Sequence, residues 1–200
     1  MSAVVKSEIV DGHEPGRLPT YADLAAWDEA VSRHEDSYEL VEGVPTMAPG
    51  ESPKNRTAGT LLAGLLNADR REWIAVTDLD VTLASGSRPT VRRPDVVLVR
   101  PQTARRSQRP WRVEAAEVLL VAEIVSPSSL ERDLVTKRRE YATAGIPAYL
   151  VVDLRTEPGA LTLYDRRDTI GQYAQTSTSG SVSVTIDGHR VNVQVSHLLV

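Results

Sequence analysis

The chain has 200 residues, enough for one domain with a substantial core, and 41% of its residues are hydrophobic and 25% charged. It contains no cysteine, which excludes disulfide bonds and thiolate chemistry. The first residues lack the apolar stretch of a secretion signal, and no apolar run approaches the roughly 20 residues that span a membrane. These features predict a cytoplasmic protein.

Charge is unevenly distributed along the chain. A net charge of −4 disfavours unspecific nucleic-acid binding over the whole surface, yet residues 88–112 contain eight arginines against Asp95 alone. The candidates in this segment for contacting a phosphate backbone are Arg92, Arg93, Arg105 and Arg106. The alternative is compositional bias, because the whole chain has 20 arginines and only 3 lysines.

The first third of the chain predicts two helices around a β-hairpin. Residues 20–30 predict a short helix that is capped by Thr20. Residues 38–47 predict a hairpin that turns near Gly43. Residues 52–53 then open a second helix, whose leucines recur at the spacing of one apolar stripe.

The middle of the chain predicts three strands. Residues 73–83 alternate apolar and polar side chains, as a half-buried strand does. Residues 94–99 and 118–125 are continuous apolar runs, which are typical of buried strands. The arginine-rich segment 100–112 between them is expected to be a loop.

The next predicted helix has well-marked ends. Ser128 and Glu131 have the spacing of a capping box at its start. Gly145 lies where a C-terminal cap belongs, and Pro147 follows two residues later. Residues 149–153 return as a strand, and the crossover helix predicts that this strand pairs in parallel with the preceding one.

The last part of the chain, residues 160–200, predicts β-hairpins and an edge extension, with turns at Gly180 and at Asp187–Gly188. The order of elements predicts an α/β domain, at the border of α+β, built on one mixed sheet with flanking helices and a β-rich C-terminal extension. Residues 1–18 are expected to form a flexible leader, and residues 19–200 the single domain.

Two carboxylates lie inside the apolar strands. Asp95 stands in RPDVVLV and Glu123 in LLVAEIV, where a charge is costly unless it has a partner. If the strands are neighbours, both carboxylates project from one face and bind Mg²⁺, which also relieves their repulsion. The alternatives are that Asp95 only begins a strand and that Glu123 pairs with a buried arginine.

Lys137 is a third candidate for the site. It lies four residues after Asp133 and four before Tyr141, so the three side chains share one helix face. On that face Lys137 would orient a water or neutralise charge that develops at phosphorus. The alternative is an ordinary surface ion pair with Asp133. Glu39 and Glu42, in the first hairpin, are expected to be solvated.

These motifs resemble a known family when they are taken in order. RPDVVLV, LLVAEIVSPSS, the helix with Asp133, Lys137 and Tyr141, and AGIPAYLVVD resemble the Uma-two family of the PD-(D/E)XK nuclease superfamily, which is classed with restriction endonucleases. The match covers roughly residues 20–165, and its ordered combination is more specific than any single motif. The resemblance implies a restriction-endonuclease-like mixed sheet with flanking helices.

The resemblance also implies a chemistry, which is hydrolysis of phosphodiester bonds, of DNA above all, with Mg²⁺ or Mn²⁺ as cofactor. Asp95 and Glu123 would hold the metal, and Lys137 would assist the attacking water. The lysine that the superfamily pattern places two residues after the glutamate would fall at Val125, and Lys137 replaces it from the following helix.

Other positions compare less simply with the family. Glu39 matches a glutamate of the family hairpin, and Glu39, Asp133 and Tyr141 are possible additional members of the site. Asn55 stands where the family often has histidine, and Leu150 where it has tryptophan. Neither departure removes an implied metal ligand, but a role for position 55 is in doubt.

A second class of function stays open beside the nuclease, namely a binding or assembly module that keeps the fold without efficient catalysis. Other enzyme classes fit poorly, because the chain lacks a G-x-S-x-G motif and a phosphate-binding glycine loop, and its four histidines are scattered. A homodimer is expected, because cutting both strands of a duplex needs two sites, and the β-rich C-terminal segment is the candidate interface.

Overall fold

The computed structural model describes residues 20–32, 38–48, 50–68, 72–106, 112–127, 129–168 and 170–199. The predicted leader, residues 1–18, lies outside the described residues, and so does Ser128 of the predicted capping box. In chain order the first elements are α1 (Leu24–Val31), β1 (Tyr38–Val41), β2 (Val44–Met47), α2 (Pro53–Ala68), β3 (Ile74–Thr77), β4 (Asp80–Ala84), β5 (Thr90–Arg92), β6 (Val96–Val99) and α3 (Pro101–Ala104).

The remaining elements begin with β7 (Arg112–Glu114) and a short 3₁₀ turn, η1 (Ala115–Glu117). They continue with β8 (Val118–Val125), the π-helical turn η2 (Arg132–Lys137), α4 (Arg138–Thr143), β9 (Tyr149–Asp153), β10 (Ala160–Arg167), β11 (Tyr173–Ser179), β12 (Ser181–Ile186), β13 (His189–Gln194) and η3 (Val195–His197).

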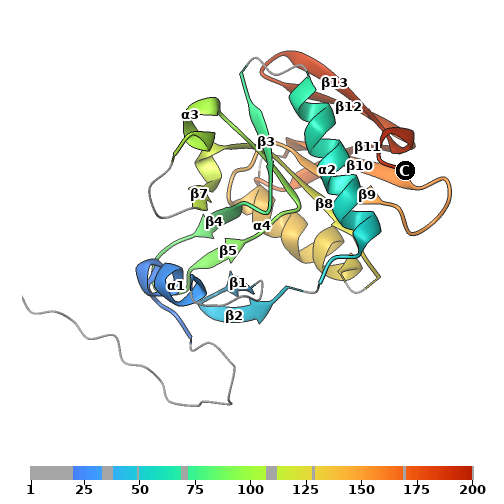
Figure 1. Ribbon diagram of the computed structural model, residues 1–200. Helices are drawn as coiled ribbons and strands as arrows, with labels where there is room; N and C mark the ends of the chain where they lie inside the picture. Colours follow the sequence, from blue (N-terminus) through green and yellow to red (C-terminus); the bar gives the residue numbers. More distant parts are fainter. Residues whose placement is uncertain are drawn as a thin grey trace, which may run out of the picture.

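The described strands form two larger sheets and a hairpin (Figure 1). The central sheet has the order β11-β10-β9-β8-β6-β3, with β8 and β9 parallel, as predicted, and its other pairs antiparallel. The second sheet has the order β2-β1-β5-β4-β7, and β12 pairs with β13. The fold class is therefore confirmed, but the strands are divided between sheets instead of joined in one.

Hydrophobic layers cover both faces of the central sheet. Because side chains alternate along a strand, Ala122 and Ile124 of β8 belong to the layer that contains α2 and the β12–β13 hairpin. Val121 and Val125 belong to the opposite layer, with Tyr141 of α4. Glu123 shares the parity of this second group, so strand geometry alone directs it toward η2 and α4.

The second sheet lies beside α1 at the lower left of Figure 1. Its hairpin β1–β2 turns at Glu42 and Gly43, which both have positive φ, as a two-residue hairpin turn requires. The predicted hairpin is thus confirmed. β1 pairs with β5 through Leu40 and Val91, so this sheet brings Glu39 next to the segment that enters β6.

Two predicted elements differ from the structure in the first half of the chain. The first helix begins at Leu24 and not at residue 20, because Asp23 is the N-cap and accepts a 2.8 Å hydrogen bond from the N–H of Ala25. The predicted strand 73–83 is two strands in two sheets. The chain turns between them at Asp78, whose φ of 54° is left-handed.

The arginine-rich segment is not entirely a loop. Pro101 opens the short helix α3, where its missing N–H costs no hydrogen bond. Arg112 begins β7, which pairs in parallel with β4. Thr90–Arg92 forms β5, a strand that the sequence analysis did not predict.

The helix after β8 was predicted as α-helical throughout, but Arg132–Lys137 forms a π-helical turn. Such turns are rare and often lie at functional sites. The far end of the helix is as predicted. Gly145 has a φ of 88°, and the N–H groups of Gly145 and Ile146 donate to the carbonyls of Ala142 and Tyr141. Among the described residues, no helix combines the length and apolarity that crossing a membrane would require.

Candidate active site

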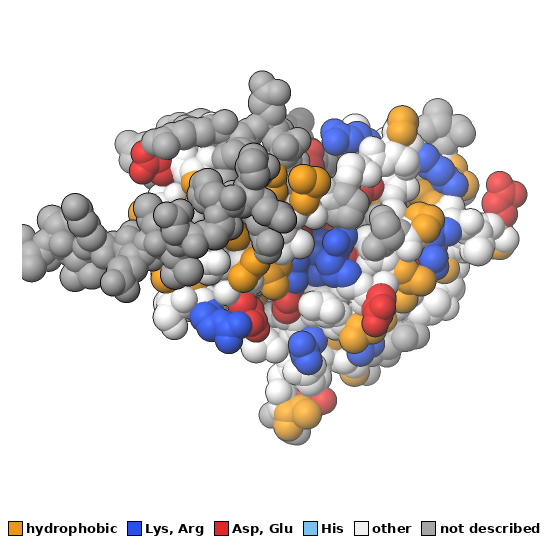
Figure 2. All heavy atoms as spheres, turned by 90° about the horizontal axis from the view of Figure 1, so that it is seen from below, with side chains coloured by type: hydrophobic (Ala, Val, Ile, Leu, Met, Phe, Trp, Pro, Cys, Tyr) orange, Lys and Arg blue, Asp and Glu red, His pale blue; other side chains and the backbone are white. Residues whose placement is uncertain are grey.

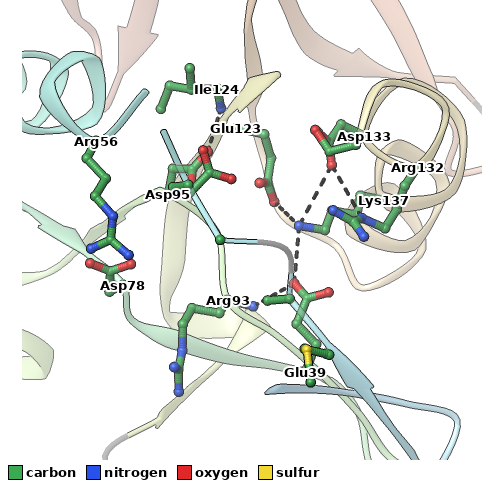
Figure 3. A pocket seen from close by; sticks show the side chains of 15 residues that line it. Glu39, Arg56, Asp78, Arg93, Asp95, Glu123, Ile124, Arg132, Asp133 and Lys137 are labelled. Atoms are coloured by element: carbon green, nitrogen blue, oxygen red, sulfur yellow. Dashed lines mark hydrogen bonds and ion pairs between the residues drawn. The ribbon is translucent and has the colours of Figure 1, made fainter. Parts of the chain in front are cut away.

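Asp95 and Glu123 come from neighbouring antiparallel strands of the central sheet. β6 pairs with β8 in the register Val96↔Ala122, and extending this register by one residue sets Asp95 against Glu123. Oδ2 of Asp95 accepts a 2.6 Å hydrogen bond from the backbone N–H of Ile124 (Figure 3). The predicted pairing of the two strands is confirmed, and both carboxylates line one pocket.

Each of these carboxylates keeps one oxygen available. Within the described part of the chain, Oδ1 of Asp95 and Oε2 of Glu123 accept no hydrogen bond. The described residues contain no group of three or more acidic or histidine side chains that would cage a metal by themselves. Two carboxylates fit a hard cation such as Mg²⁺, which takes its other ligands from water and phosphate.

Lys137 lies at the centre of the charged cluster. Its Nζ is 2.8 Å from Oε1 of Glu123, 3.1 Å from Oε1 of Glu39 and 3.8 Å from Oδ1 of Asp133. The hydroxyl of Tyr141 donates a 2.6 Å hydrogen bond to the same oxygen of Glu123. Lys137 is only 3% exposed, so a surface ion pair does not describe it, and the buried partner of Glu123 is this lysine and not an arginine.

Glu39 is buried instead of solvated, whereas Glu42 is exposed as expected. Glu39 accepts hydrogen bonds from Nη1 of Arg92 at 2.8 Å and from the backbone N–H of Arg93 at 3.1 Å. Arg92 also binds both carboxylate oxygens of Glu140 at 2.8 Å. Glu39 therefore connects the lysine of the site to a buried arginine, and both its oxygens are engaged with nitrogen atoms.

The pKa values of the carboxyl groups separate according to their surroundings. Burial raises the pKa of Glu123 to about 8, against the attraction of Lys137 and with the help of Asp95. Burial also raises the pKa of Asp95 to about 7. Burial alone would raise the pKa of Glu39, but Lys137 and Arg92 lower it to about 2. Glu39 thus stays ionised, and Asp95 and Glu123 are the groups that a cation would stabilise in ionised form.

The other predicted site residues support this cluster. Asp133 is 1% exposed, and its Oδ1 has no hydrogen-bond partner among the described residues. The hydroxyl of Tyr149 donates to the carbonyl of Asp133 at 2.9 Å, which ties the π-helical turn to the central sheet. Nδ2 of Asn55 binds Oε2 of Glu51 at 3.0 Å, and Leu150 is fully buried in the core.

The pocket above these residues has a volume of about 300 Å³. The carboxylates that line it are Glu39, Glu51, Asp78, Asp95, Glu123 and Asp133, and the cations are Arg56, Arg93, Arg132 and Lys137. The described lining therefore has two negative charges in excess. The sequence analysis missed Arg56 and Arg132. Arg132 stands next to Asp133, which was a usable signal, whereas nothing in the sequence marks Arg56.

Most arginines of residues 88–112 are neutralised by carboxylates. The ion pairs are Arg88–Glu42, Arg92–Glu39, Arg92–Glu140, Arg93–Asp80, Arg100–Asp187, Arg106–Glu117, Arg112–Asp28 and Arg112–Glu114. Arg92 is 2% exposed, so a direct contact with nucleic acid is wrong for this residue. Where side chains are coloured in Figure 2, basic groups stand apart from one another among acidic and hydrophobic ones.

The described part of the chain thus forms a mixed α/β domain that places Asp95 beside Glu123 and Lys137 on the next helical segment. The chain belongs to the Uma2 family, whose description is "Putative restriction endonuclease" and whose model matches residues 19–195. It is also similar in fold to a crystal structure described as a "putative nuclease belonging to DUF820" from Anabaena variabilis. That similarity has a TM-score of 0.63 at 12% identity and covers 86% of this chain and 96% of the other. A search of curated proteins found no match.

Proposed function

We propose that this protein is a metal-dependent nuclease that hydrolyses phosphodiester bonds of nucleic acid, with DNA as its expected substrate. The observation that carries the proposal is the position of Asp95, directly before β6, opposite Glu123 of β8. One oxygen of each accepts no hydrogen bond from the described residues, and Lys137 is 2.8 Å from Glu123. The chain belongs to a family whose description is "Putative restriction endonuclease", and this membership supports the same activity.

The cofactor that suits the site is Mg²⁺ or Mn²⁺, held by Asp95 and Glu123. Such a cation, when bound, lowers the pKa of a water molecule that it holds and neutralises negative charge on the phosphate. Bound there, it would neutralise the ionised forms of Asp95 and Glu123, which would otherwise repel a phosphodiester.

The remaining residues of the site prepare the substrate and the nucleophile. Lys137 places an ammonium group on the pocket wall, where it attracts the phosphate and donates hydrogen bonds to the attacking water or to the charge that develops on the phosphate oxygens. Tyr141 and Glu39 keep the Lys137–Glu123 pair in place, because Tyr141 donates a hydrogen bond to Glu123 and Glu39 forms an ion pair with Lys137. Hydrolysis then forms a bond from the water oxygen to phosphorus and breaks a phosphorus–oxygen ester bond.

The experiment that tests the proposal compares cleavage of plasmid and single-stranded DNA by the wild type, Glu123→Gln and Asp95→Asn, with Mg²⁺, Mn²⁺ or EDTA. The two amides keep the size of the carboxylates but lose the charge, so the cleavage rate should fall at least 100-fold. Glu131→Gln is the matched control, because Glu131 is exposed next to the π-helical turn and does not line the pocket. It should cleave within about twofold of the wild-type rate. Equal cleavage by Glu123→Gln, or cleavage in EDTA, would contradict the proposal.

A binding or assembly module of the nuclease fold is the second candidate. One observation favours it, namely that carboxylates neutralise most of the described arginines of residues 88–112. The metal nuclease binds a cation through Asp95 and Glu123, so Mg²⁺ should raise the melting temperature of the wild type and not that of Asp95→Asn. A module that binds no metal shows no such rise.

We further propose a homodimer, which light scattering would test. The suggested interface is the β-rich C-terminal segment, and one part of it, the inner face of the β12–β13 hairpin, is already used by the protein's own core.

A further inference from the structure

We infer that Arg56 and Arg132 are the phosphate-binding pair of this pocket and hold the backbone of a nucleic-acid strand across Asp95 and Glu123. This inference rests on the proposed function and names the side chains that bind its substrate. Neither arginine belongs to the arginine-rich segment that the sequence suggests for this role.

The two arginines approach the acidic residues from different elements. Arg56 is on α2, Arg132 is on the π-helical turn η2, and both line the same pocket as Asp95 and Glu123. In Figure 3 Arg56 lies on one side of the two carboxylates and Arg132 on the other. A strand that passes from one arginine to the other would cross the carboxylates on its way.

The other two cations of the described lining are already engaged. Lys137 is held by Glu123 and Glu39. Nε and Nη2 of Arg93 bind the two carboxylate oxygens of Asp80 at 2.6 and 2.9 Å. In contrast, the guanidinium of Arg56 has no ion pair or hydrogen bond within the described part of the chain. Arg56 is exposed, so a ligand can reach it.

Arg132 carries a donor that lacks its acceptor. Its Nε is buried and has no hydrogen-bond partner among the described residues. Its nearest carboxylate oxygen, Oδ1 of Asp133, is 3.9 Å away and has no hydrogen-bond partner either. A buried donor without an acceptor is costly, so such atoms usually receive a ligand or a water.

A phosphodiester supplies what both arginines lack. The guanidinium group donates two parallel hydrogen bonds to a pair of phosphate oxygens, and among the described residues no carboxylate accepts a hydrogen bond from either arginine, Asp133 being 3.9 Å from Nε of Arg132. The side chain of Arg132 is 28% exposed and lines the pocket, so a ligand there can reach its guanidinium. The pair would therefore fix the strand on both sides of the bond that is cut.

The test measures the Kd of a fluorescein-labelled 16-nucleotide single-stranded DNA by fluorescence anisotropy at several salt concentrations. Ca²⁺ replaces Mg²⁺, because it takes the same oxygen ligands, and a gel checks that the DNA stays intact. Arg56→Ala and Arg132→Ala should each raise Kd about tenfold and reduce the slope of log Kd against log salt by about 0.7. Arg132→Lys keeps the positive charge but cannot donate two parallel hydrogen bonds to one phosphate. It should therefore have the salt slope of the wild type but only part of its affinity for DNA.

Arg139→Ala is the matched control, since Arg139 is exposed on α4, one turn from the π-helical segment, and does not line the pocket. It removes the same charge and should change Kd less than twofold. Thermal melts check that all variants are folded. Values of Kd within twofold of wild type for both pocket variants, with an unchanged salt slope, would overturn the inference and indicate that a bound water satisfies Nε of Arg132.

The same experiment separates this inference from the proposed function. If the wild type binds no DNA, the proposed function fails, and the inference fails with it. If the wild type binds and cleaves DNA while both arginine variants behave like it, only the arginine pair is wrong. Loss of binding in both variants, with wild-type affinity in Arg139→Ala, supports the two together.

Discussion

At the scale of single residues, the burial of Glu39 is a feature of the site that the sequence does not suggest. It is 3% exposed and lies between two cations, Arg92 at 2.8 Å and Lys137 at 3.1 Å. Its two oxygens both face nitrogen atoms, whereas one oxygen each of Asp95 and Glu123 accepts no hydrogen bond from the described residues. Glu39 therefore fixes the ammonium of Lys137, and Asp95 and Glu123 are the carboxylates that we propose as metal ligands.

Replacing Glu39 by glutamine should lower the free energy of unfolding by about 2 kcal/mol, because two buried cations then lose a carboxylate while each keeps another one. Glu42→Gln is the control on the same hairpin. Glu42 and its partner Arg88 are 62% and 71% exposed, and such pairs contribute about 0–1 kcal/mol. Urea denaturation measures both variants. If they lose the same free energy, the buried position of Glu39 does not matter and its positioning role is wrong.

A buried environment is predictable from the sequence where it is local. Glu123 stands inside an uninterrupted apolar strand, so its burial is readable from its neighbours. Arg92 is different, because its partners Glu39 and Glu140 are 53 and 48 residues away in the chain. No spacing rule connects residues so far apart, and a buried arginine then looks the same as a surface one.

At the scale of elements, the β1–β2 hairpin presents Glu39 to the site, and its turn depends on Gly43. This glycine has a φ of 80°, and a Cβ there would lie 2.6 Å from the carbonyl oxygen of Tyr21. Gly188, in the β12–β13 turn, has the same backbone with a φ of 81° but nothing within 4 Å. Gly64, inside α2, has open space and no positive φ.

These three glycines provide a graded series of alanine variants. Gly188→Ala should cost about 1 kcal/mol from left-handed backbone strain alone. Gly43→Ala should cost clearly more, roughly 3 kcal/mol, because strain and the clash with Tyr21 add up. Gly64→Ala should gain roughly 0.5–1 kcal/mol, since alanine is the better helix former. Chemical denaturation gives all three values, and a Gly43→Ala as stable as Gly188→Ala would show that the hairpin is not held at Tyr21.

Elements were predictable where one periodicity runs without interruption. The hairpin, α2, β8 and β9 follow their patterns, and the cap at Gly145 was visible in the sequence. The split of residues 73–83 depends on the backbone of Asp78, and aspartate tolerates the left-handed region without requiring it. The π-helical turn has the same composition as an α-helix, so its presence follows from tertiary contacts such as the bond from Tyr149 to the carbonyl of Asp133.

At the scale of the whole molecule, the metal-free protein carries two carboxyl groups whose pKa values are higher than in the unfolded chain. Asp95 rises from 3.8 to about 7 and Glu123 from 4.5 to about 8. Between about pH 4.5 and 8 the native state therefore holds more protons than the unfolded state, and its free energy of unfolding falls as pH rises. The pKa of Glu39 is lowered to about 2, so its stabilising contribution to folding is complete above pH 4.5 and does not change in this pH range.

In EDTA, the free energy of unfolding should drop by roughly 6 kcal/mol between pH 5 and pH 8, because both raised pKa values lie within or at the end of this range. Glu123→Gln removes the more strongly shifted group and should flatten this dependence by at least half. Mg²⁺ should stabilise the wild type more at pH 8 than at pH 6, because it binds the deprotonated carboxylates. Denaturation curves at three pH values decide the matter, and a stability that rises from pH 5 to pH 8 in EDTA would contradict the assigned pKa directions.

The delivery of the lysine from the π-helical turn has a consequence for how such a protein can change during evolution. Position 125, where the superfamily pattern expects that lysine, is taken by Val125, which is 1% exposed in the hydrophobic layer under α4. Under the proposed function, β8 then supplies only Glu123 to the site, and position 125 is left for packing. Substitutions in the helix can then shift the ammonium group and alter substrate preference, while the pairing of β6, β8 and β9 stays intact.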